Sequence, residues 1–178
     1  MIRRVLMIVA IIAGLLAAIS GSPYRADRAS LDVAQLAQMV AKEEDHVTAL
    51  ELAQWIRDRK EDLRVIDVRD ADAFAEYHVP RAELVPMERI TATPFRNDET
   101  IVLISDGGAH AAQAWVFLRA LGHRNVFFLR GGVGEWLDEV MNPAKPTELT
   151  RYFGGMPRVD DGSPTAATTA ASIRRRGC

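Results

Sequence analysis

The sequence predicts an α/β fold of three layers, in which helices cover both faces of a central parallel sheet. Short apolar runs rich in β-branched or aromatic residues alternate with helical patterns along the middle of the chain. Three of these runs are almost continuously apolar, which is typical of strands buried on both faces and therefore of a parallel sheet. The chain has 178 residues, 48% of them hydrophobic and 26% charged, enough for one domain with additional segments.

The first segment, residues 1–22, is expected to be a signal peptide or a membrane anchor. Arg3 and Arg4 precede residues 5–19, a hydrophobic helical stretch without any charge. Its length is compatible with both interpretations. In either case the arginines stay in the cytoplasm and the rest of the chain lies outside it. We therefore expect a protein of the bacterial cell envelope, anchored in the inner membrane through residues 5–19 with its domain in the periplasm, or periplasmic or secreted after signal cleavage.

Two helices are predicted before the first strand. The first lies in a linker, residues 23–44, with Ser30 as its expected N-cap. Its apolar stripe should pack on the following domain and consists of Val33, Leu36, Ala37 and Val40. Thr48 and Glu51 form a capping box that starts the second helix. The buried side of that helix is Leu52, Trp55 and Ile56.

Four apolar runs are the predicted strands, and two more helices follow the later ones. The strands are residues 65–68, 82–85, 101–104 and 126–129. The helix after the third strand ends at Gly122. Its expected buried face is Ala114, Phe117, Leu118 and Leu121. Another helix follows Gly131 and Gly132 and runs through Trp136 and Leu137.

Residues 143–178 are expected to form a Pro/Gly-rich segment and then a disordered basic tail. Prolines and glycines interrupt regular structure from Pro143 onwards, and residues 162–172 are rich in Ala, Thr and Ser without an apolar period.

Composition excludes several classes of function. The net charge of −2 gives no reason to expect nucleic acid. The single cysteine, Cys178, excludes an intrachain disulfide, a Cys-based zinc site and an iron–sulfur cluster. His78 and His123 have no second ligand at metal-binding spacing, so we expect them to make structural hydrogen bonds. No metal and no cofactor is therefore expected.

Three stretches, in order, resemble the rhodanese homology domain. The first is residues 65–69 followed by Phe74 and residues 78–80, the second is residues 101–112, and the third is residues 122–136. Tyr77 and Arg81 stand where glycines are usual in that family. The resemblance covers residues 45–142 and implies the rhodanese-like three-layer fold, a parallel sheet of about five strands flanked by helices. It also implies a reactive loop at the carboxyl end of a central strand.

The same resemblance places Ser105 where active members carry the cysteine that accepts sulfane sulfur. The loop it opens consists of Ser105, Asp106, Gly107, Gly108, Ala109, His110 and Ala111. A cysteine ionises near pH 8.5 and lower at a helix N-terminus, whereas an alcohol stays protonated and cannot hold a transferable persulfide. We therefore expect no catalytic residue, no sulfur transfer through Ser105 and no phosphatase chemistry by that route.

The loop is still expected to bind a ligand. Backbone N–H groups in a Gly-rich turn that opens a helix form an anion cradle, and the expected contacts are Ser105, Gly107, Gly108 and His110. Asp106 acts against a bound anion, and His110 offsets it only when protonated. A neutral ligand or a peptide is therefore favoured over thiosulfate, with a small molecule or an envelope protein as the partner.

Several residues have alternative interpretations. Ser105, Asp106 and His110 suggest a hydrolase, but Leu103 stands where a nucleophile elbow needs glycine. Asp67 and Arg69 are interpreted as scaffold residues that order neighbouring loops through ion pairs. The tryptophans are core or partner surface. They are Trp55, Trp115 and Trp136.

Cys178 leaves two functions open. It follows three arginines, which lower a thiol pKa, so it can in principle carry sulfur in place of Ser105. The other interpretation is a disulfide dimer, a mixed disulfide or no role. The main hypothesis is a rhodanese-like binding or scaffolding module without sulfurtransferase activity. The alternative is a thiosulfate-type sulfurtransferase or redox protein that uses Cys178.

Overall fold

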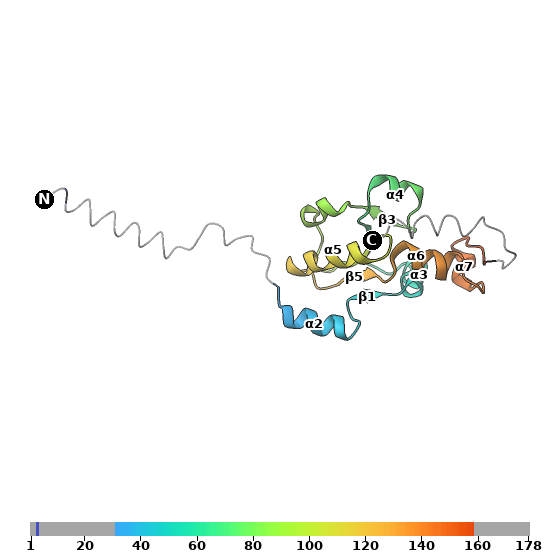
Figure 1. Cartoon of the computed structure of the whole chain (residues 1–178), viewed down its shortest axis with the longest axis horizontal. Helices are drawn as coiled ribbons and strands as arrows, with labels where there is room; N and C mark the ends of the chain where they lie inside the picture. Colours follow the sequence, from blue (N-terminus) through green and yellow to red (C-terminus); the bar gives the residue numbers. More distant parts are fainter. Residues whose placement is uncertain (1–2, 4–30, 159–178) are drawn as a thin grey trace. The chain divides into compact units, whose positions relative to one another are not determined.

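Five parallel strands form one sheet with the order β1-β5-β4-β2-β3. Figure 1 labels β1, β3 and β5 among the helices that surround the sheet. They are His46–Val47 (β1), Leu63–Asp67 (β2), Ala82–Leu84 (β3), Thr100–Ile104 (β4) and Val126–Leu129 (β5). The four predicted strands are confirmed as β2 to β5. The short edge strand β1 was not identified from its pattern, because two residues are too few to show a period.

The structure is a computed structural model that describes residue 3 and residues 31–158. Several predictions concern residues outside this range, namely residues 1–22, Ser30, residues 162–172 and Cys178. Of these, only Arg3 is described. Within the described part, no helix is long and apolar enough to cross a membrane.

The central strand β4 is buried on both faces, as its apolar run predicts. Val102 and Ile104 belong to one core cluster, together with residues of α3 (Ala49–Arg57) and α6 (Gly132–Trp136). Ile101 and Leu103 belong to the other cluster, which includes residues of α5 (Ala109–Ala120) and the 3₁₀ helix η2 (Met87–Ala92). Because successive side chains of a strand point to opposite faces, this split gives the three layers, helices, sheet and helices.

Helix α3 starts as the sequence predicts. The Thr48 hydroxyl accepts the Glu51 N–H at 3.2 Å, and the Glu51 carboxylate accepts the Thr48 N–H at 2.9 Å. Leu52 and Ile56 are buried, while Trp55 is half-buried and packs edge-on against Phe127. The capping box therefore positions the first helix that covers the sheet.

Helix α2 (Val33–Ala41) differs from the prediction at both its start and its contact face. Its N-cap is Asp32, not Ser30, and the Asp32 side chain accepts the Gln35 N–H at 3.0 Å. Val33 and Val40 are exposed. The residues that pack against the core are Leu36 and Met39. The prediction is confirmed for Leu36 and wrong for the other residues of the stripe, Val33, Ala37 and Val40, which are exposed.

Helix α5 also turns a different face inward. Ala114 and Leu118 are buried as predicted, but Phe117 and Leu121 are exposed. Trp115 takes their place, because its indole N–H donates to the Val126 carbonyl at 2.8 Å and fixes the helix against β5. The helix stops before Gly122, whose φ of +96° confirms the predicted terminus.

Residues expected to break regular structure after Pro143 contain the short helix α7 (Glu148–Tyr152). Thr147 caps it, and the Thr147 hydroxyl accepts the Thr150 N–H at 3.1 Å. Leu149 is buried in the same core cluster as α3. The buried leucine and the cap explain why this segment packs on the domain. The remaining helices are α4 (Ala71–Glu76) and the π-helical turn η3 (Leu137–Met141).

Candidate functional site

The candidate site is the loop that joins the carboxyl end of β4 to α5. A second loop, between β5 and α6, packs directly against it. The Val133 N–H donates to the Ser105 carbonyl at 2.9 Å, and the Gly134 N–H donates to the Asp106 carbonyl at 3.1 Å. A Cβ on Gly132 would lie 2.0 Å from the Ser105 carbonyl oxygen, so only glycine permits this approach. The two loops therefore hold each other at the edge where parallel α/β sheets place their sites.

Ser105 is buried in this loop, with 1% of its surface exposed. Its hydroxyl oxygen accepts two backbone N–H groups, that of Gly108 at 3.1 Å and that of Ala111 at 3.2 Å. Two donors of the predicted anion cradle are thus satisfied by the chain itself. This corrects the expectation that the Ser105 side chain faces a ligand, because its polar atom points into the start of α5.

Three other N–H groups of the loop belong to exposed residues and have no hydrogen-bond acceptor among residues 31–158. They are those of Gly107, Ala109 and His110. They lie at the start of α5, where the helix dipole adds partial positive charge. The loop therefore presents hydrogen-bond donors to solvent, which suit a carbonyl, carboxylate or other oxygen acceptor.

Asp106 is held by Arg69, which follows β2. The Arg69 guanidinium donates to Asp106 at 3.1 Å, to Asp67 at 2.9 Å and 2.7 Å, and to the Tyr77 carbonyl at 2.6 Å. Burial lowers the pKa of Arg69, but the hydrogen bonds and charges of Asp67 and Asp106 outweigh it and raise that pKa. Arg69 thus ties β2, the end of α4 and the candidate loop together.

This arrangement confirms the scaffold interpretation of Asp67 and Arg69 and extends it to Asp106. From its position in the loop, Asp106 is expected to be a free charge that opposes an anion. In the structure Arg69 compensates part of its charge, because the same guanidinium also pairs with Asp67, so that opposition is weaker than expected. No sequence signal linked the two residues, because 37 positions separate them.

Residues 48–139, about half of the chain, match the family described as the rhodanese-like domain. This chain belongs to the rhodanese-like domain family.

Two curated relatives of this rhodanese-like chain carry sulfurtransferase names. It is 30% identical over 98 residues to a "Probable adenylyltransferase/sulfurtransferase MoeZ" of Mycobacterium tuberculosis, covering 53% of this chain and 25% of the relative. It is 31% identical over 125 residues to a "Probable 3-mercaptopyruvate sulfurtransferase" of Pseudomonas aeruginosa, covering 51% of this chain and 43% of the relative. The chain therefore spans less than half of either relative.

A solved structure agrees with the fold. The BH2092 protein from Bacillus halodurans superposes with a TM-score of 0.51 at 28% identity, covering 59% of this chain and 80% of the other. The α/β rhodanese fold with a five-stranded parallel sheet, expected from the motifs, is thus confirmed.

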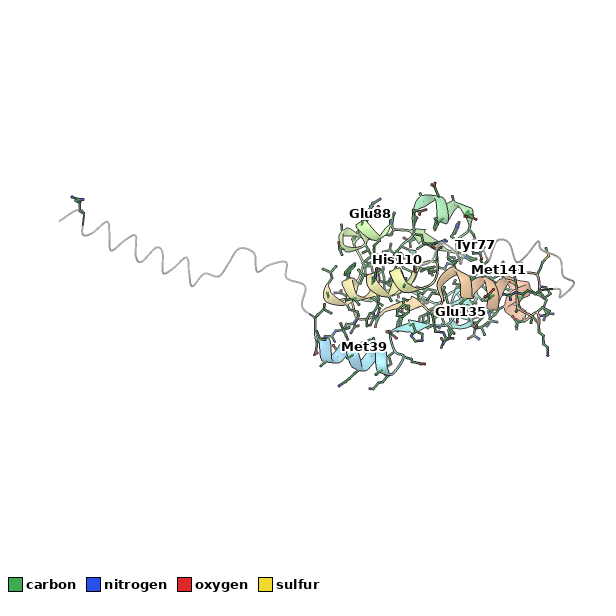
Figure 2. The ribbon with its side chains drawn as sticks, in the orientation of Figure 1. Met39, Tyr77, Glu88, His110, Glu135 and Met141 are labelled. Carbon is green, nitrogen blue, oxygen red and sulfur yellow. The ribbon has the colours of Figure 1, made fainter. Side chains whose placement is uncertain are left out.

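The rhodanese-like loop does not bring a hydrolase set together. His110 is exposed at the start of α5 (Figure 2), and within the described residues no hydrogen bond joins it to Ser105 or Asp106. Asp106 is engaged by Arg69 instead. Ser105, Asp106 and His110 are therefore neighbours in sequence without the relay geometry of an activated serine.

His78 and His123, which were both expected to make structural hydrogen bonds, differ in their side-chain contacts. The Nδ1 atom of His78 lies 2.9 Å from the Phe74 carbonyl, and its ring stacks on Phe74, which confirms a structural role. The Nδ1 atom of His123 is buried without a hydrogen-bond partner in the described part of the chain, so the bond expected there is absent. His123 instead packs edge-on against Phe95. No group of three His, Cys, Asp or Glu side chains gathers as a metal site within residues 31–158.

Tyr77 is the first of the two residues that stand where the family usually has glycine, and it has a packing role. Its hydroxyl accepts the Trp136 indole N–H at 2.8 Å, and burial raises the pKa of its phenol. Figure 2 labels it just after α4. It therefore links the segment after α4 to the helix that follows the second loop.

Proposed function

We propose that this chain is a rhodanese-like binding module of the bacterial cell envelope that does not transfer sulfur through its β4–α5 loop. The proposal rests on the position, burial and hydrogen bonds of Ser105. It stands where the family resemblance has the sulfur-carrying cysteine, and its hydroxyl is buried and accepts two backbone N–H groups.

The chemistry of sulfur transfer explains why this matters. A thiolate attacks the sulfane sulfur of the donor, the donor's S–S bond breaks, and the leaving group departs with the bonding electrons. An alcohol at this position stays protonated at neutral pH and forms no persulfide. The donors that would stabilise a thiolate here instead hold the neutral Ser105 hydroxyl.

The same loop is suited to binding. The N–H groups of Gly107, Ala109 and His110 offer donors, and Arg69 compensates part of the charge of Asp106 next to them. A peptide carbonyl or a small ligand with an oxygen acceptor fits this arrangement, with contacts at Gly107, Ala109 and His110, while the Gly108 N–H is already bound to Ser105. Residues 5–19, as a signal or anchor, supply the support for an envelope location and an envelope partner.

The alternative is a sulfurtransferase or redox protein that uses the tail thiol Cys178. The sulfurtransferase names of the two curated relatives favour it. The two proposals differ in one respect that can be measured, because only the alternative requires the thiol of Cys178 for turnover. A disulfide dimer through Cys178 is compatible with the first proposal.

A thiosulfate:cyanide sulfurtransferase assay separates them. Residues 21–178 are assayed as wild type, as Cys178→Ala and as Ser105→Cys, with thermal unfolding of each protein as the folding control. A silent wild type is expected. Turnover in the wild type that disappears in Cys178→Ala would establish the alternative. Any activity gained by Ser105→Cys reports that the loop still accepts a sulfur donor.

The location has its own test. Cells that express the full chain are fractionated, and the intact inner membrane is exposed to protease from the periplasmic side. We expect the rhodanese-like domain to be in the periplasm or to be digested there. Protection of the domain inside sealed spheroplasts would refute the envelope assignment.

A further inference from the structure

A pocket lies away from the Ser105 loop and has a different character. Its volume is about 470 Å³, and its lining is Ile56, Arg59, Pro80, Arg81, Tyr152 and Phe153. This size is typical of sites for small molecules. The residues come from the end of α3, the turn before β3 and the end of α7. Three segments that are distant in the sequence therefore build it.

The pocket is separate from the candidate site. Arg59 precedes β2 and Arg81 precedes β3, so both lie near the amino ends of their strands, whereas Ser105 follows the carboxyl end of β4. Ala82 pairs with Val65, which pairs with Val102. Arg81 is thus about four residues behind Ser105 along the strand direction, or roughly 13 Å.

Both arginines occupy backbone positions that favour glycine. Arg59 has φ +53° just after α3, where the Lys60 N–H donates to the Trp55 carbonyl and the Arg59 N–H to the Ile56 carbonyl. This is a Schellman motif, whose left-handed residue is usually glycine. The backbone geometry alone gives no reason for an arginine there.

Arg81 repeats this situation in a turn. The Ala82 N–H donates to the Val79 carbonyl at 3.0 Å, Pro80 occupies the second position, and Arg81 has φ +68° at the third. This is the arrangement of a type II turn, which favours glycine at that place. Two side chains carried on unfavourable backbone thus reach the same pocket, and local strain of this kind is a recognised indication of function.

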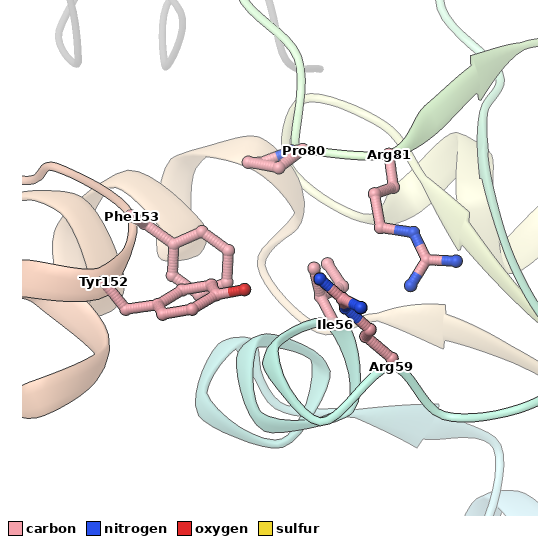
Figure 3. Close-up of a pocket in the computed structure, with 6 residues that line it drawn as sticks. All are labelled: Ile56, Arg59, Pro80, Arg81, Tyr152 and Phe153. Carbon is pink, nitrogen blue, oxygen red and sulfur yellow. The ribbon is translucent and has the colours of Figure 1, made fainter.

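The charges of the pocket are uncompensated. Neither Arg59 nor Arg81 has an ion pair or a side-chain hydrogen bond among residues 31–158. The nearby carboxylates of Asp58 and Glu148 are paired with Arg57 instead, at 2.8 Å and 3.7 Å. Figure 3 shows both guanidinium groups and the Tyr152 hydroxyl pointing into the space over Ile56. Two cations that face one space attract an anion.

The rest of the lining is apolar. Ile56 is buried, Pro80 and Phe153 are half-buried, and the Tyr152 ring forms one side of the pocket. Such a surface suits an apolar ligand body. A carboxylate carries one negative charge and is easier to desolvate over it than a phosphate dianion, while it still accepts the fork of an arginine.

We propose that the pocket between α3, the β3 turn and α7 binds a small organic carboxylate with an apolar body, held by Arg59 and Arg81. The carboxylate lies between the two guanidinium groups, the Tyr152 hydroxyl donates a further hydrogen bond, and the apolar body lies on Ile56 and Phe153. This site does not depend on the function proposed for the Ser105 loop.

The test is a calorimetric titration of the full-length chain with phenylacetate as the probe. Acetate lacks the apolar body, and benzyl alcohol lacks the charge. We expect saturable phenylacetate binding at one site, with each of the other two compounds at least about tenfold weaker, since a hydrogen bond to a charged group and a buried ring each contribute at least that factor.

Variants identify the site. Arg59→Gln and Arg81→Gly should each weaken phenylacetate at least about tenfold. Arg89→Gln, which removes an exposed arginine of η2 outside the pocket, should not change binding. Arg81→Gly also relieves the positive φ, so its melting temperature should not fall, and a loss of binding there is no consequence of unfolding. The proposal is overturned if phenylacetate shows no saturable binding, or if Arg59→Gln and Arg81→Gly bind it as the wild type does.

Discussion

Arg69 is the residue whose removal should affect the domain most. It is 8% exposed, and its main partner Asp67 is fully buried. Its guanidinium makes three hydrogen bonds to Asp67, of 2.9 Å, 3.2 Å and 2.7 Å, one to Asp106 of 3.1 Å and one to the Tyr77 carbonyl of 2.6 Å. Arg69→Leu leaves the Asp67 carboxylate buried without a counter-charge.

The expected cost follows from that burial. Breaking a buried ion pair by removing one partner costs about 3–5 kcal/mol, because the remaining charge stays desolvated. A domain of this size has a free energy of unfolding of about 5–15 kcal/mol, so the loss is a large fraction of it. Removing both partners leaves no unpaired charge at the fully buried position 67, so Arg69→Leu combined with Asp67→Leu should recover part of the loss, while Asp106 and the Tyr77 carbonyl still lack their donor.

Urea unfolding followed by tryptophan fluorescence measures both variants. Arg96→Leu is the matched control, since Arg96 is exposed and its ion pairs with Asp62 and Asp98 lie at the surface. It should leave the midpoint nearly unchanged. The reasoning is refuted if Arg69→Leu costs less than about 1 kcal/mol, or if the double variant is as unstable as the single one.

Three further predictions concern glycines in the loops, the Ser105 hydroxyl and the Thr48 cap of α3. Gly132→Ala should cost more than about 2 kcal/mol and displace the Ser105 loop, whereas Gly122→Ala, with a positive φ but open space around it, should cost only about 1 kcal/mol; urea unfolding compares them, and equal costs would contradict the steric argument. Ser105→Ala should cost about 1–3 kcal/mol, because two buried N–H groups lose their acceptor, and an unchanged urea midpoint would show that water replaces it. Thr48→Ala should cost about 1 kcal/mol at neutral pH. The Thr48 hydrogen bonds lower the pKa of Glu51 from its usual 4.5, so the stabilisation exists above that value and is lost as the pH falls through the lowered pKa. Thr48→Ala keeps the backbone N–H that binds the Glu51 carboxylate and loses only the bonds of the hydroxyl. The gap between the melting temperatures of wild type and Thr48→Ala should therefore narrow from pH 7 to pH 3 without closing, because the bond from the Glu51 N–H to the hydroxyl does not depend on pH, and a constant gap would refute the linkage.

Local patterns predicted the elements that local physics controls. Four strands, the Thr48 capping box and the helix stop at Gly122 were placed within a residue or two, because hydrophobic period, side-chain caps and positive φ act over a few neighbouring residues. The errors in the buried faces of helices fall where more than one face of a helix is apolar, whereas β1 and α7 were missed because they are too short to show a period. In α5 both the predicted stripe and the stripe with Trp115 satisfy the period, and only the position of β5 decides between them.

The candidate site divides in the same way. Its place after β4 and the chemical nature of Ser105, an alcohol and not a thiol, follow from the sequence, because a strand–loop–helix boundary and a side-chain identity are local. The way the loop turns into α5 decides two further features. The Ser105 hydroxyl accepts two N–H groups of its own loop, and other N–H groups of the loop have no acceptor among residues 31–158.

The fold class, most of the strand and helix positions, and the type of group that ends the central strand therefore follow from the residues alone. The pairing of Arg69 with Asp106, and the pocket that Arg59 and Arg81 share with the end of α7, follow only from the folded chain. The physical reason is distance along the chain. Contacts between segments tens of residues apart depend on strand register and on which helix face packs inward, and these are settled only when the whole core assembles.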